Sequence, residues 1–422
     1  MSEAQLPSAL AAVVADPGAY ADWDALHDTL GHIRRAHPFA RAELPGFHPF
    51  WVAAKHADIQ QVALAGSIFL SGLGGLQDNA TLAHAAKAGV GRQFRSIVAM
   101  NAPEHMKYRQ LTQAWFAPKN VRKLEDGIRL LAQRQVARLR ELGSECDFVA
   151  VVASHYPLLV VMSILGVPER DEPMMLRLTQ QYFGSQDDEL KRGGAQQTAD
   201  EAARALADVV AEADAYFRPI SQDRRQRPQD DLISVVANSV VDGAPISEVD
   251  AMGYYITAAF AGHDTTASSM AGGIWALCER PAVLRAVQAD PSLIPALVEE
   301  SIRWTTPIHQ FVRRAAQEHA VRGQTVRKND WVVLCFPSGN RDEEVFDDPF
   351  EFRVDRSNNR HISFGYSAHM CLGMHLARLE MRIFFEELLP HLSALELAGT
   401  PTRTVTTFVG GPKSVPIRYR MS

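Results

Sequence analysis

The sequence predicts a mainly α-helical protein with a small β region. Two long stretches, Lys123–Leu142 and Thr198–Phe217, carry apolar residues at helical spacing. Short β-prone segments are confined to His319–Phe336 and the C-terminal end, where turn residues separate them. No stretch of the 422 residues has the composition of a linker, so we expect residues 1–422 to form a single large domain.

Bulk composition excludes several classes of function. The net charge of -6 leaves no basic excess to neutralise phosphates, so nucleic acid is not an expected partner. The basic run Asp223–Pro228 is interpreted as a solvated loop. The most apolar stretch, Val151–Val167, contains His155 and Pro157 and therefore favours a buried helix over a membrane span. With four cysteines lacking paired spacing and no basic N-terminal leader, the expected location is the cytoplasm.

The longest helix is expected after Ser247, which forms a cap signal with Asp250, and nothing interrupts the pattern until Pro281. About 30 residues at ~1.5 Å each span roughly 45–50 Å, so this helix must cross the core. Its middle reads "AGHDTT", and buried carboxyl and hydroxyl groups are costly unless paired. Two interpretations stay open: a local kink with a satisfied Asp264, or a distorted helix with a polar notch in which Asp264 and Thr265 handle protons.

Glu300 and Arg303 lie three residues apart and share a helix face. The helix pattern stops at once at Thr306-Pro307, and a strand-like segment follows. We therefore expect a structural ion pair that locks a neighbouring loop.

Cys371 lies in a glycine-containing loop just before an amphipathic run. It can be a buried thiol, a zinc ligand with His369, a catalytic thiol or an iron thiolate. No second ligand pair stands at zinc-like spacing, and His369 is too close in sequence to be a typical triad base. For an iron thiolate, the helix N-terminus would lower the thiol pKa. Gly365 and Gly373 would let the loop lie flat against a planar cofactor, with Phe364 packed below it.

Four separated segments together resemble the cytochrome P-450 monooxygenases. "AGHDTT", "ESIR" and "FGYSAHMCLG" resemble the oxygen-activating helix, the E-x-x-R helix and the haem-cysteine loop, and "PEHMKYRQLTQAWFAP" resembles the H-x-x-x-R propionate helix. Each motif alone is weak, but the combination covers the whole chain. "NRDEEVF" and "FVGGPKSVPIR" are further similar to the soluble bacterial branch that includes a terpineol hydroxylase.

The resemblance implies a site built around haem b. It makes Cys371 the axial iron ligand, with Phe364 beside the cofactor and propionate ligands at His105, Arg109, Arg313 and His369. Asp264 and Thr265 match the acid–alcohol pair that delivers protons during O₂ activation. Glu300 and Arg303 match a structural pair. Keeping the acid–alcohol pair favours a monooxygenase over a haem-thiolate sensor or a peroxide-driven peroxygenase.

The family pattern also implies an apolar pocket for a small substrate, expected to be a monoterpenoid or an alkyl-aromatic. The expected lining residues, each of which is equally compatible with plain core, are Thr257, Phe260, Ala261, Phe311, Val312, Phe408 and Val409. The glycine-rich segment Phe69–Gly89 resembles the variable loop that covers the substrate and is interpreted as a lid.

Because the chain carries no flavin or iron–sulfur module, electrons must come from outside. The resemblance implies an iron–sulfur ferredoxin and its NAD(P)H-dependent reductase, acting on a monomer. Basic residues near the propionate helix form either a docking patch or a solvated helix face: Lys107, Arg109, Lys119, Arg122 and Lys123.

Two positions depart from the family pattern. Ser367 stands where the cysteine loop usually has a second glycine, and Asn101-Ala102-Pro103 replaces the common Asp-Pro-Pro. We expect the cysteine loop to sit slightly differently for this reason, without loss of a ligand.

Overall fold

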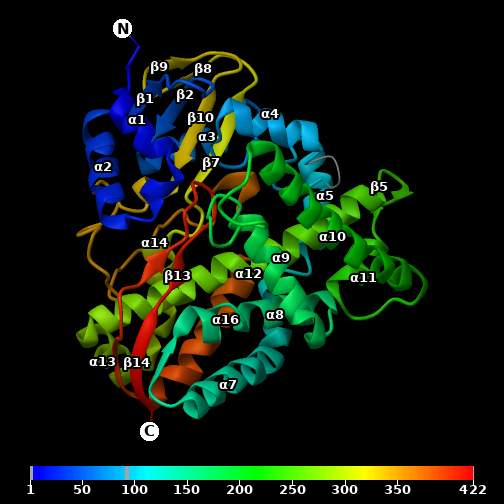
Figure 1. The fold of residues 1–422 in the computed structure, drawn as a ribbon, viewed down its shortest axis with the longest axis vertical. Helices are drawn as coiled ribbons and strands as arrows, with labels where there is room; N and C mark the ends of the chain where they lie inside the picture. Colours follow the sequence, from blue (N-terminus) through cyan, green and yellow to red (C-terminus); the bar gives the residue numbers. More distant parts are fainter. Residues whose placement is uncertain (1–2, 91–94, 422) are drawn as a thin grey trace.

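Helices dominate the computed structural model, which describes residues 3–90 and 95–421 (Figure 1). Helices hold 54% of the chain and strands 13%, which confirms the mainly α prediction. The α-helices are α1 (Ser8–Ala15), α2 (Trp23–Ala36), α3 (His56–Leu64), α4 (Asn79–Ala88), α5 (Glu104–Gln113), α6 (Pro118–Val121), α7 (Glu125–Leu142), α8 (Tyr156–Leu165), α9 (Glu172–Phe183), α10 (Ala199–Gln226), α11 (Leu232–Ala237), α12 (Glu248–Glu279), α13 (Pro281–Ala289), α14 (Ile294–Thr305), α15 (Phe336–Gly339) and α16 (Met374–Leu388).

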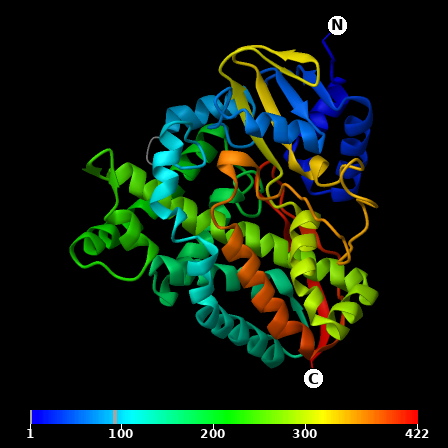
Figure 2. The ribbon, with the colours of Figure 1, turned by 180° about the vertical axis from the view of Figure 1, so that it is seen from behind.

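The strands gather mainly at two ends of the molecule. A five-stranded sheet of order β1-β2-β10-β7-β3 lies at the N-terminal end beside α1 and α2, and a three-stranded sheet of order β11-β14-β4 lies near the C-terminus (Figures 1 and 2). The strands are β1 (Phe39–Ala42), β2 (Phe50–Ala53), β3 (Phe69–Leu70), β4 (Glu145–Asp147), β5 (Val240–Val241), β6 (Ala244–Pro245), β7 (Gln310–Ala315), β8 (His319–Val321), β9 (Gln324–Val326), β10 (Trp331–Cys335), β11 (Leu392–Leu397), β12 (Thr402–Arg403), β13 (Pro412–Ser414) and β14 (Pro416–Met421).

The region predicted as small hairpins is only partly a hairpin. β8 and β9 pair across a tight turn. β10 instead leaves its sequence neighbour and lies between β7, antiparallel, and β2, parallel. All five residues of β10 are buried, so side-chain packing on both faces of the sheet decides where this strand pairs.

α12 crosses the middle of the molecule and forms its central element (Figure 1). The Ser247 side chain accepts the backbone N–H of Asp250, as the cap signal predicted, and the helix ends before Pro281. α12 packs against α8, α10, α14 and α16. α8 follows a single π-helical turn at Val149–Ala153 and is almost wholly buried, as predicted for this apolar stretch.

α10 begins where the helical pattern predicted, with Thr198 as its cap, but runs beyond the predicted end, through Pro219, to Gln226. The interpretation of residues 223–228 as a solvated loop is therefore wrong for most of that run. Arg224 is buried on the helix and donates from Nε to the Asp231 carboxylate at 2.7 Å. In the described part of the chain, no helix is long and apolar enough to cross a membrane.

Candidate functional site

The cysteine loop lies between α15 and α16 and closes with a tight turn just before α16. The Cys371 N–H donates to the Phe364 carbonyl at 2.7 Å, which closes the loop on itself. The Cys371 residue is exposed. The surrounding protein raises the pKa of its thiol, whereas the Gly373 N–H and the guanidinium groups of Arg109 and Arg378 favour the thiolate. The start of α16 therefore favours the thiolate through the Gly373 N–H, as predicted, but desolvation outweighs this effect and the net pKa of the thiol is raised.

A cationic cluster lies beside the cysteine loop. The rings of His105, on α5, and His369 stack with centroids 4.1 Å apart. Burial, followed by the charges of His105, Arg313 and Arg109, lowers the pKa of His369 to about 3. Burial also lowers the pKa of Arg313 to about 10. Neither Arg109 nor Arg313 forms a salt bridge within residues 3–90 and 95–421.

This donor set fits a cofactor that carries two carboxylates. Two guanidinium groups and two imidazoles converge without an acidic partner, and unpaired buried cations are costly. Guanidinium groups bind carboxylates through charge-assisted hydrogen bonds. The exposed Cys371 thiol supplies a soft ligand for iron beside them. Haem b, with two propionates and an iron, matches this arrangement.

Ser71 belongs to the same cluster and was missed in the sequence. Its hydroxyl lies 3.2 Å from Nε2 of His369. The Asn101 side chain accepts the Ser71 N–H at 2.7 Å and donates to the Ser71 carbonyl at 3.1 Å. Asn101, which stands where the family pattern commonly has Asp, therefore ties the loop at Ser71 to the start of α5. No local signal marks Ser71, because its partners are distant in sequence.

Ser367 has a backbone φ of 62°, in the left-handed region that favours glycine. The neighbouring Gly365 has a φ of 73° and donates its N–H to Ile362 at 2.9 Å. The cysteine loop therefore keeps the turn that the family pattern implies, with a strained serine in place of the second glycine.

The middle of α12 presents a half-buried stripe in an otherwise buried stretch. Thr257, Ala261, Asp264 and Thr265 are half-buried, whereas their neighbours Phe260, His263 and Thr266 are buried. The Thr265 hydroxyl donates to the Ala261 carbonyl at 2.9 Å.

The α-helix is continuous through this region, so the predicted distortion is absent. Gly262 packs against α8 in this region. A Cβ on Gly262 would lie 2.8 Å from Cγ2 of Val161 on α8. This glycine therefore lets two helices pack closely.

Asp264 is a half-buried acid without a side-chain partner. Its carboxylate forms no hydrogen bond or ion pair in the described residues, and burial raises its pKa to about 7. The alternative of a local kink in which Asp264 has a hydrogen-bond partner is therefore wrong. An acid of this pKa exchanges protons near neutral pH.

The E-x-x-R pair is fully buried. Arg303 donates from Nη2 and Nε to the Glu300 carboxylate at 2.6 and 2.8 Å, and both side chains are 0% exposed. Burial opposes ionisation of Glu300, but the hydrogen bonds and charge of Arg303 hold its pKa below the ordinary value. Arg356, which the sequence analysis missed, donates to the same carboxylate at 3.1 Å. Arg303 also donates to the carbonyls of Asn340, Pro349 and Glu351, so the pair fixes this loop.

An aromatic chain links three of the predicted pocket segments. Phe260 of α12 contacts Tyr182 at 5.2 Å, Tyr182 contacts Phe183 at 5.1 Å, and Phe183 contacts Phe408 at 6.4 Å. Phe408 then contacts Phe311 of β7 at 5.4 Å, all measured between ring centroids. Tyr182 and Phe183 end α9 and were not predicted.

The remaining pocket candidates divide by burial. Thr257, Ala261, Phe311 and Phe408 are half-buried, and the Thr257 hydroxyl lies 3.0 Å from that of Ser96. Phe260, Val312 and Val409 are buried in the core. Val312 packs in the apolar cluster under α1 and α2. The placement therefore favours the first four as wall residues.

The glycine-rich segment predicted as a lid is tied to the same walls. Gly74 accepts the Val312 N–H at 2.7 Å, and Leu76 accepts the Thr407 hydroxyl at 3.2 Å. A Cβ on Gly75 would lie 2.9 Å from Cβ of Phe408, so only glycine fits this approach. The α9–α10 connection reaches the same loop, since Gln186 Oε1 accepts the Thr407 N–H at 2.9 Å.

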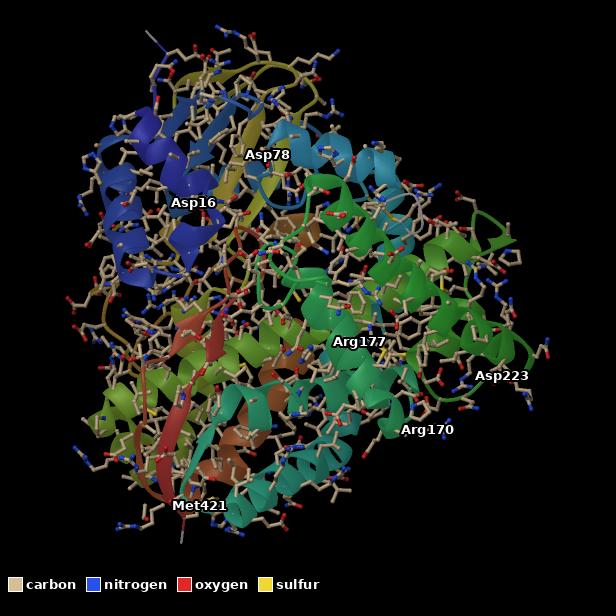
Figure 3. The ribbon with its side chains drawn as sticks, in the orientation of Figure 1. Asp16, Asp78, Arg170, Arg177, Asp223 and Met421 are labelled. Atoms are coloured by element: carbon tan, nitrogen blue, oxygen red, sulfur yellow. The ribbon has the colours of Figure 1, made fainter. Side chains whose placement is uncertain are left out.

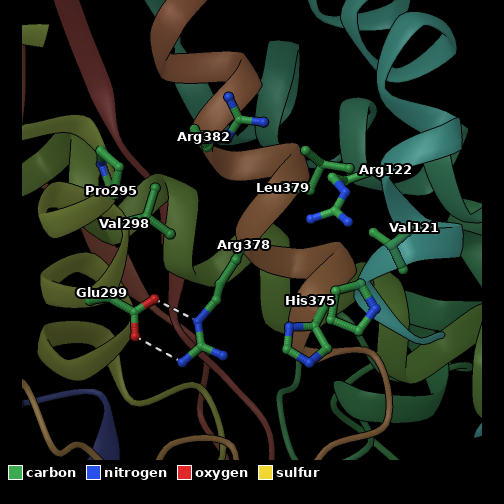
Figure 4. Close-up of a pocket in the computed structure, with 10 residues that line it drawn as sticks. Val121, Arg122, Pro295, Val298, Glu299, His375, Arg378, Leu379 and Arg382 are labelled. Carbon is green, nitrogen blue, oxygen red and sulfur yellow. Dashed lines mark hydrogen bonds and ion pairs between the residues drawn. The ribbon is translucent and has the colours of Figure 1, made fainter. Parts of the chain in front are cut away.

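A groove of about 230 Å³ lies between α6, α14 and α16, the helix that follows the cysteine loop (Figure 4). It is lined by Pro118, Val121, Arg122, Pro295, Val298, Glu299, His375, Arg378, Leu379 and Arg382. Arg378 pairs with Glu299, whose pKa falls to about 2 because hydrogen bonds from His361 and Arg378 outweigh its burial.

Only part of the predicted basic patch is available for docking. Lys107 donates to Asp242 at 2.6 Å, and Arg109 lies in the cationic cluster beside His369. Lys119, Arg122 and Lys123 are exposed near the groove.

As for the zinc interpretation of Cys371, the described residues contain no group of three or more ligand side chains that could hold a metal ion.

Comparison with known proteins agrees with this geometry. A family model described as "Cytochrome P450" matches residues 20–415. The chain is 45% identical to "Cytochrome P450-terp" of Pseudomonas sp over 99% of both chains. It is 28% identical to "Linalool 8-monooxygenase" of Pseudomonas putida over 93% of this chain and 95% of the relative.

Solved structures show the same fold. The crystal structure of CYP108D1 from Novosphingobium aromaticivorans matches with a TM-score of 0.91 and 41% identity, over 99% of this chain and 100% of that one. The Mycobacterium marinum cytochrome P450 CYP268A2 in complex with pseudoionone matches with a TM-score of 0.84 and 31% identity, over 93% and 94% of the two chains.

Proposed function

The chain belongs to the cytochrome P450 family of monooxygenases, and we propose that it hydroxylates a small hydrophobic substrate, a monoterpenoid or an alkyl-aromatic. The observation that carries this proposal is the half-buried stripe of α12, in which Thr265 and the unpartnered Asp264 lie on the same helix as Phe260 of the aromatic chain. When bound, haem b supplies the iron at which O₂ is activated and one oxygen atom is transferred.

The chain's own residues hold the cofactor. Cys371 is the residue that would bind the haem iron, and the Gly373 N–H would stabilise its thiolate. Arg109 and Arg313 provide the charge for the propionates, while His105 and His369 act as neutral donors. Phe364 lies under the guanidinium of Arg378 at 4.6 Å, which fixes the loop that carries the ligand.

Asp264 and Thr265 are the proposed proton carriers. The Asp264 carboxyl exchanges protons near its pKa of about 7. The Thr265 hydroxyl, which donates to Ala261 in this structure, reorients to pass a proton on the accessible side of α12. Both groups lie on a rigid helix, so their positions are set before substrate arrives.

The walls support a compact apolar substrate. Phe311, Phe408, Tyr182 and Phe183 supply ring surfaces from three separate segments. The adjacent hydroxyls of Thr257 and Ser96 provide a polar group that orients an alcohol or ketone. Two relatives are named for or bound to terpenoid molecules, linalool and pseudoionone, which favours this substrate class.

The proposed electron donor is an external iron–sulfur ferredoxin, reduced by an NAD(P)H-dependent reductase. Lys119, Arg122 and Lys123 are exposed positive charges, and Arg122 lines the groove between α6, α14 and α16 (Figure 4). An acidic partner seated there would lie close to α16 and the loop that carries Cys371, the proposed iron ligand.

Two measurements test the proposal. Reduced protein under carbon monoxide should show the Soret shift of a thiolate-bound haem, and a folded protein without that band would end the assignment of Cys371. A spin-state screen with monoterpenoids and alkylbenzenes should then find ligands that convert the ferric haem to high spin. Those ligands should be hydroxylated with NAD(P)H, ferredoxin and reductase. Turnover only with added peroxide indicates a peroxygenase, and ligand binding without turnover indicates a sensor.

A further inference from the structure

A second cationic cluster lies away from the haem-binding residues, between α2, the segment after α15, and β12. Its members are His27, Arg34, Arg341 and Arg403, and each side chain is at least nine-tenths buried. The charges of Arg341, Arg34 and Arg403 all act on the His27 ring. The Arg403 guanidinium lies over the Trp23 ring at 3.7 Å, and the Trp23 and His27 rings are 4.7 Å apart.

The cluster has too few negative charges. Arg34 pairs with Glu343 at 2.7 Å. Arg341 donates to the carbonyls of Arg303 and Trp304. Neither Arg341 nor Arg403 forms a salt bridge with any residue that the structure describes. Glu300 and Asp24 act on Arg341 and Arg403 only through space, and two buried guanidinium groups without a directly paired carboxylate are strongly unfavourable.

The same side chains also leave polar atoms without partners. These atoms are Nδ1 and Nε2 of His27, Nη2 of Arg34, Nε of Arg341, Nε and Nη2 of Arg403, and Nε1 of Trp23. Native proteins leave few buried polar atoms unpaired. Most of these atoms are N–H donors, so the group that completes them accepts hydrogen bonds and carries negative charge.

We propose that His27, Arg34, Arg341 and Arg403 form an internal binding site for a small inorganic anion of the chloride class. A halide ion is spherical, so it accepts hydrogen bonds from several N–H donors in different directions without a preferred angle. The surrounding side chains are nearly closed to solvent, which favours a monatomic ion over phosphate or sulfate. Bound there, the ion links α2 to β12 and offsets the mutual repulsion of the arginines.

This site lies next to the loops that carry the proposed pocket. His309 stacks on Tyr20 at 4.9 Å and lies 5.4 Å from Trp23, and it donates its backbone N–H to the Phe408 carbonyl at 2.8 Å. The anion is therefore expected to stabilise the base of the Phe408 loop. The inference does not depend on the substrate proposed above.

The test is the melting temperature of the ferric holoprotein in sodium chloride and in sodium gluconate at equal ionic strength. Chloride should raise the melting temperature by about 2 °C or more. Arg403→Met should abolish this rise. Arg170→Met should keep it, because Arg170 projects from the surface with its side chain 82% exposed (Figure 3). Equal melting temperatures in the two salts for the unmodified protein would overturn the proposal.

Crystals of the unmodified protein grown in sodium bromide give a readout that needs no variant. An anomalous bromide peak among Arg34, Arg341, Arg403 and His27 supports the site, whereas well-ordered water alone at that place contradicts it. If Arg403→Met does not fold, His27→Gln takes its place in the melting experiment, with the same expected loss of the chloride effect.

Discussion

The imidazole rings of His105 and His369 stack 4.1 Å apart, although one belongs to α5 and the other to the cysteine loop. Burial and neighbouring charges hold the pKa of both rings below the ordinary value. The two rings are therefore neutral near pH 7, and the formal charge of the cluster resides on Arg109 and Arg313. Carboxylate binding at this place depends chiefly on the two arginines.

Replacing Arg313 by methionine removes one of these charges and keeps most of the side-chain volume. Since a hydrogen bond to a charged group contributes about 1.5–3 kcal/mol, haem should dissociate roughly 10–100 times faster. Transfer of haem to apomyoglobin measures the rate. Arg314→Met is the matched control, because Arg314 is exposed on the same strand and donates to Asn329 at 3.1 Å. Equal rates for the two variants would remove Arg313 from the site.

Thr265→Ala should separate electron use from product formation. The variant loses the hydroxyl that passes protons, while the helix backbone stays intact because, among the described residues, the Thr265 hydroxyl bonds only to the Ala261 carbonyl one turn earlier. NAD(P)H oxidation should continue, peroxide should accumulate and the yield of hydroxylated product per NAD(P)H should fall. Thr265→Ser keeps a hydroxyl and should remain coupled. Unchanged coupling in the alanine variant would exclude the proposed role.

The parts of the fold that the sequence predicted are those with local signals. α12 begins at a side-chain cap and ends at a proline, and both signals lie within a few residues of the boundary. α10 continues past Pro219 because tertiary contacts hold its last turns, including the buried Arg224–Asp231 pair. β10 pairs with two distant strands for a similar reason. Such contacts leave no trace in a local pattern.

The same distinction applies to the site. Glu300 and Arg303 are three residues apart, so a helix alone brings them together. Arg356, Ser71, Tyr182 and Phe183 reach their partners only through the fold. Their residue types are common in loops and helices, which is why spacing gave no indication of them.

The pKa of Asp264 predicts a pH dependence in turnover. Burial raises this pKa from 3.8 to about 7, so the carboxyl is protonated below pH 7 and loses its proton above it. The coupled rate should therefore fall as the pH rises through about 7. Asp264→Asn should be roughly 100-fold slower and lack this transition, since asparagine cannot relay protons in the same way. A transition that persists in Asp264→Asn belongs to another group.

The Asp264 carboxyl should make the protein less stable as the pH rises, whereas a salt-bridged acid makes a protein more stable as the pH rises. Between pH 3.8 and about 7 the folded state binds more protons at Asp264 than the unfolded state. The free energy of unfolding contributed by this group therefore decreases as the pH rises through that range. Denaturant titrations of the unmodified protein and Asp264→Asn at several pH values isolate this slope, which should be absent from the variant.

Ser367 offers a direct test of strain in the cysteine loop. Its φ of 62° is costly for a residue with a Cβ, by about 1–2 kcal/mol, and its hydroxyl forms no hydrogen bond in the described residues. Glycine relieves the strain but loses more chain entropy on folding, about 0.5–1 kcal/mol. Ser367→Gly should therefore stabilise the holoprotein by about 1 kcal/mol or less, measured by denaturant unfolding.

Gly365→Ala provides the comparison in the same loop. Gly365 has a φ of 73°, and an added Cβ would lie 3.4 Å from the His369 carbonyl. This variant should lose about 1–2 kcal/mol, because alanine cannot adopt the left-handed region without strain. Opposite effects of the two substitutions identify backbone conformation as the cause. If Ser367→Gly also destabilises the protein, the serine side chain contributes a contact that offsets its strain, and the loop depends on it.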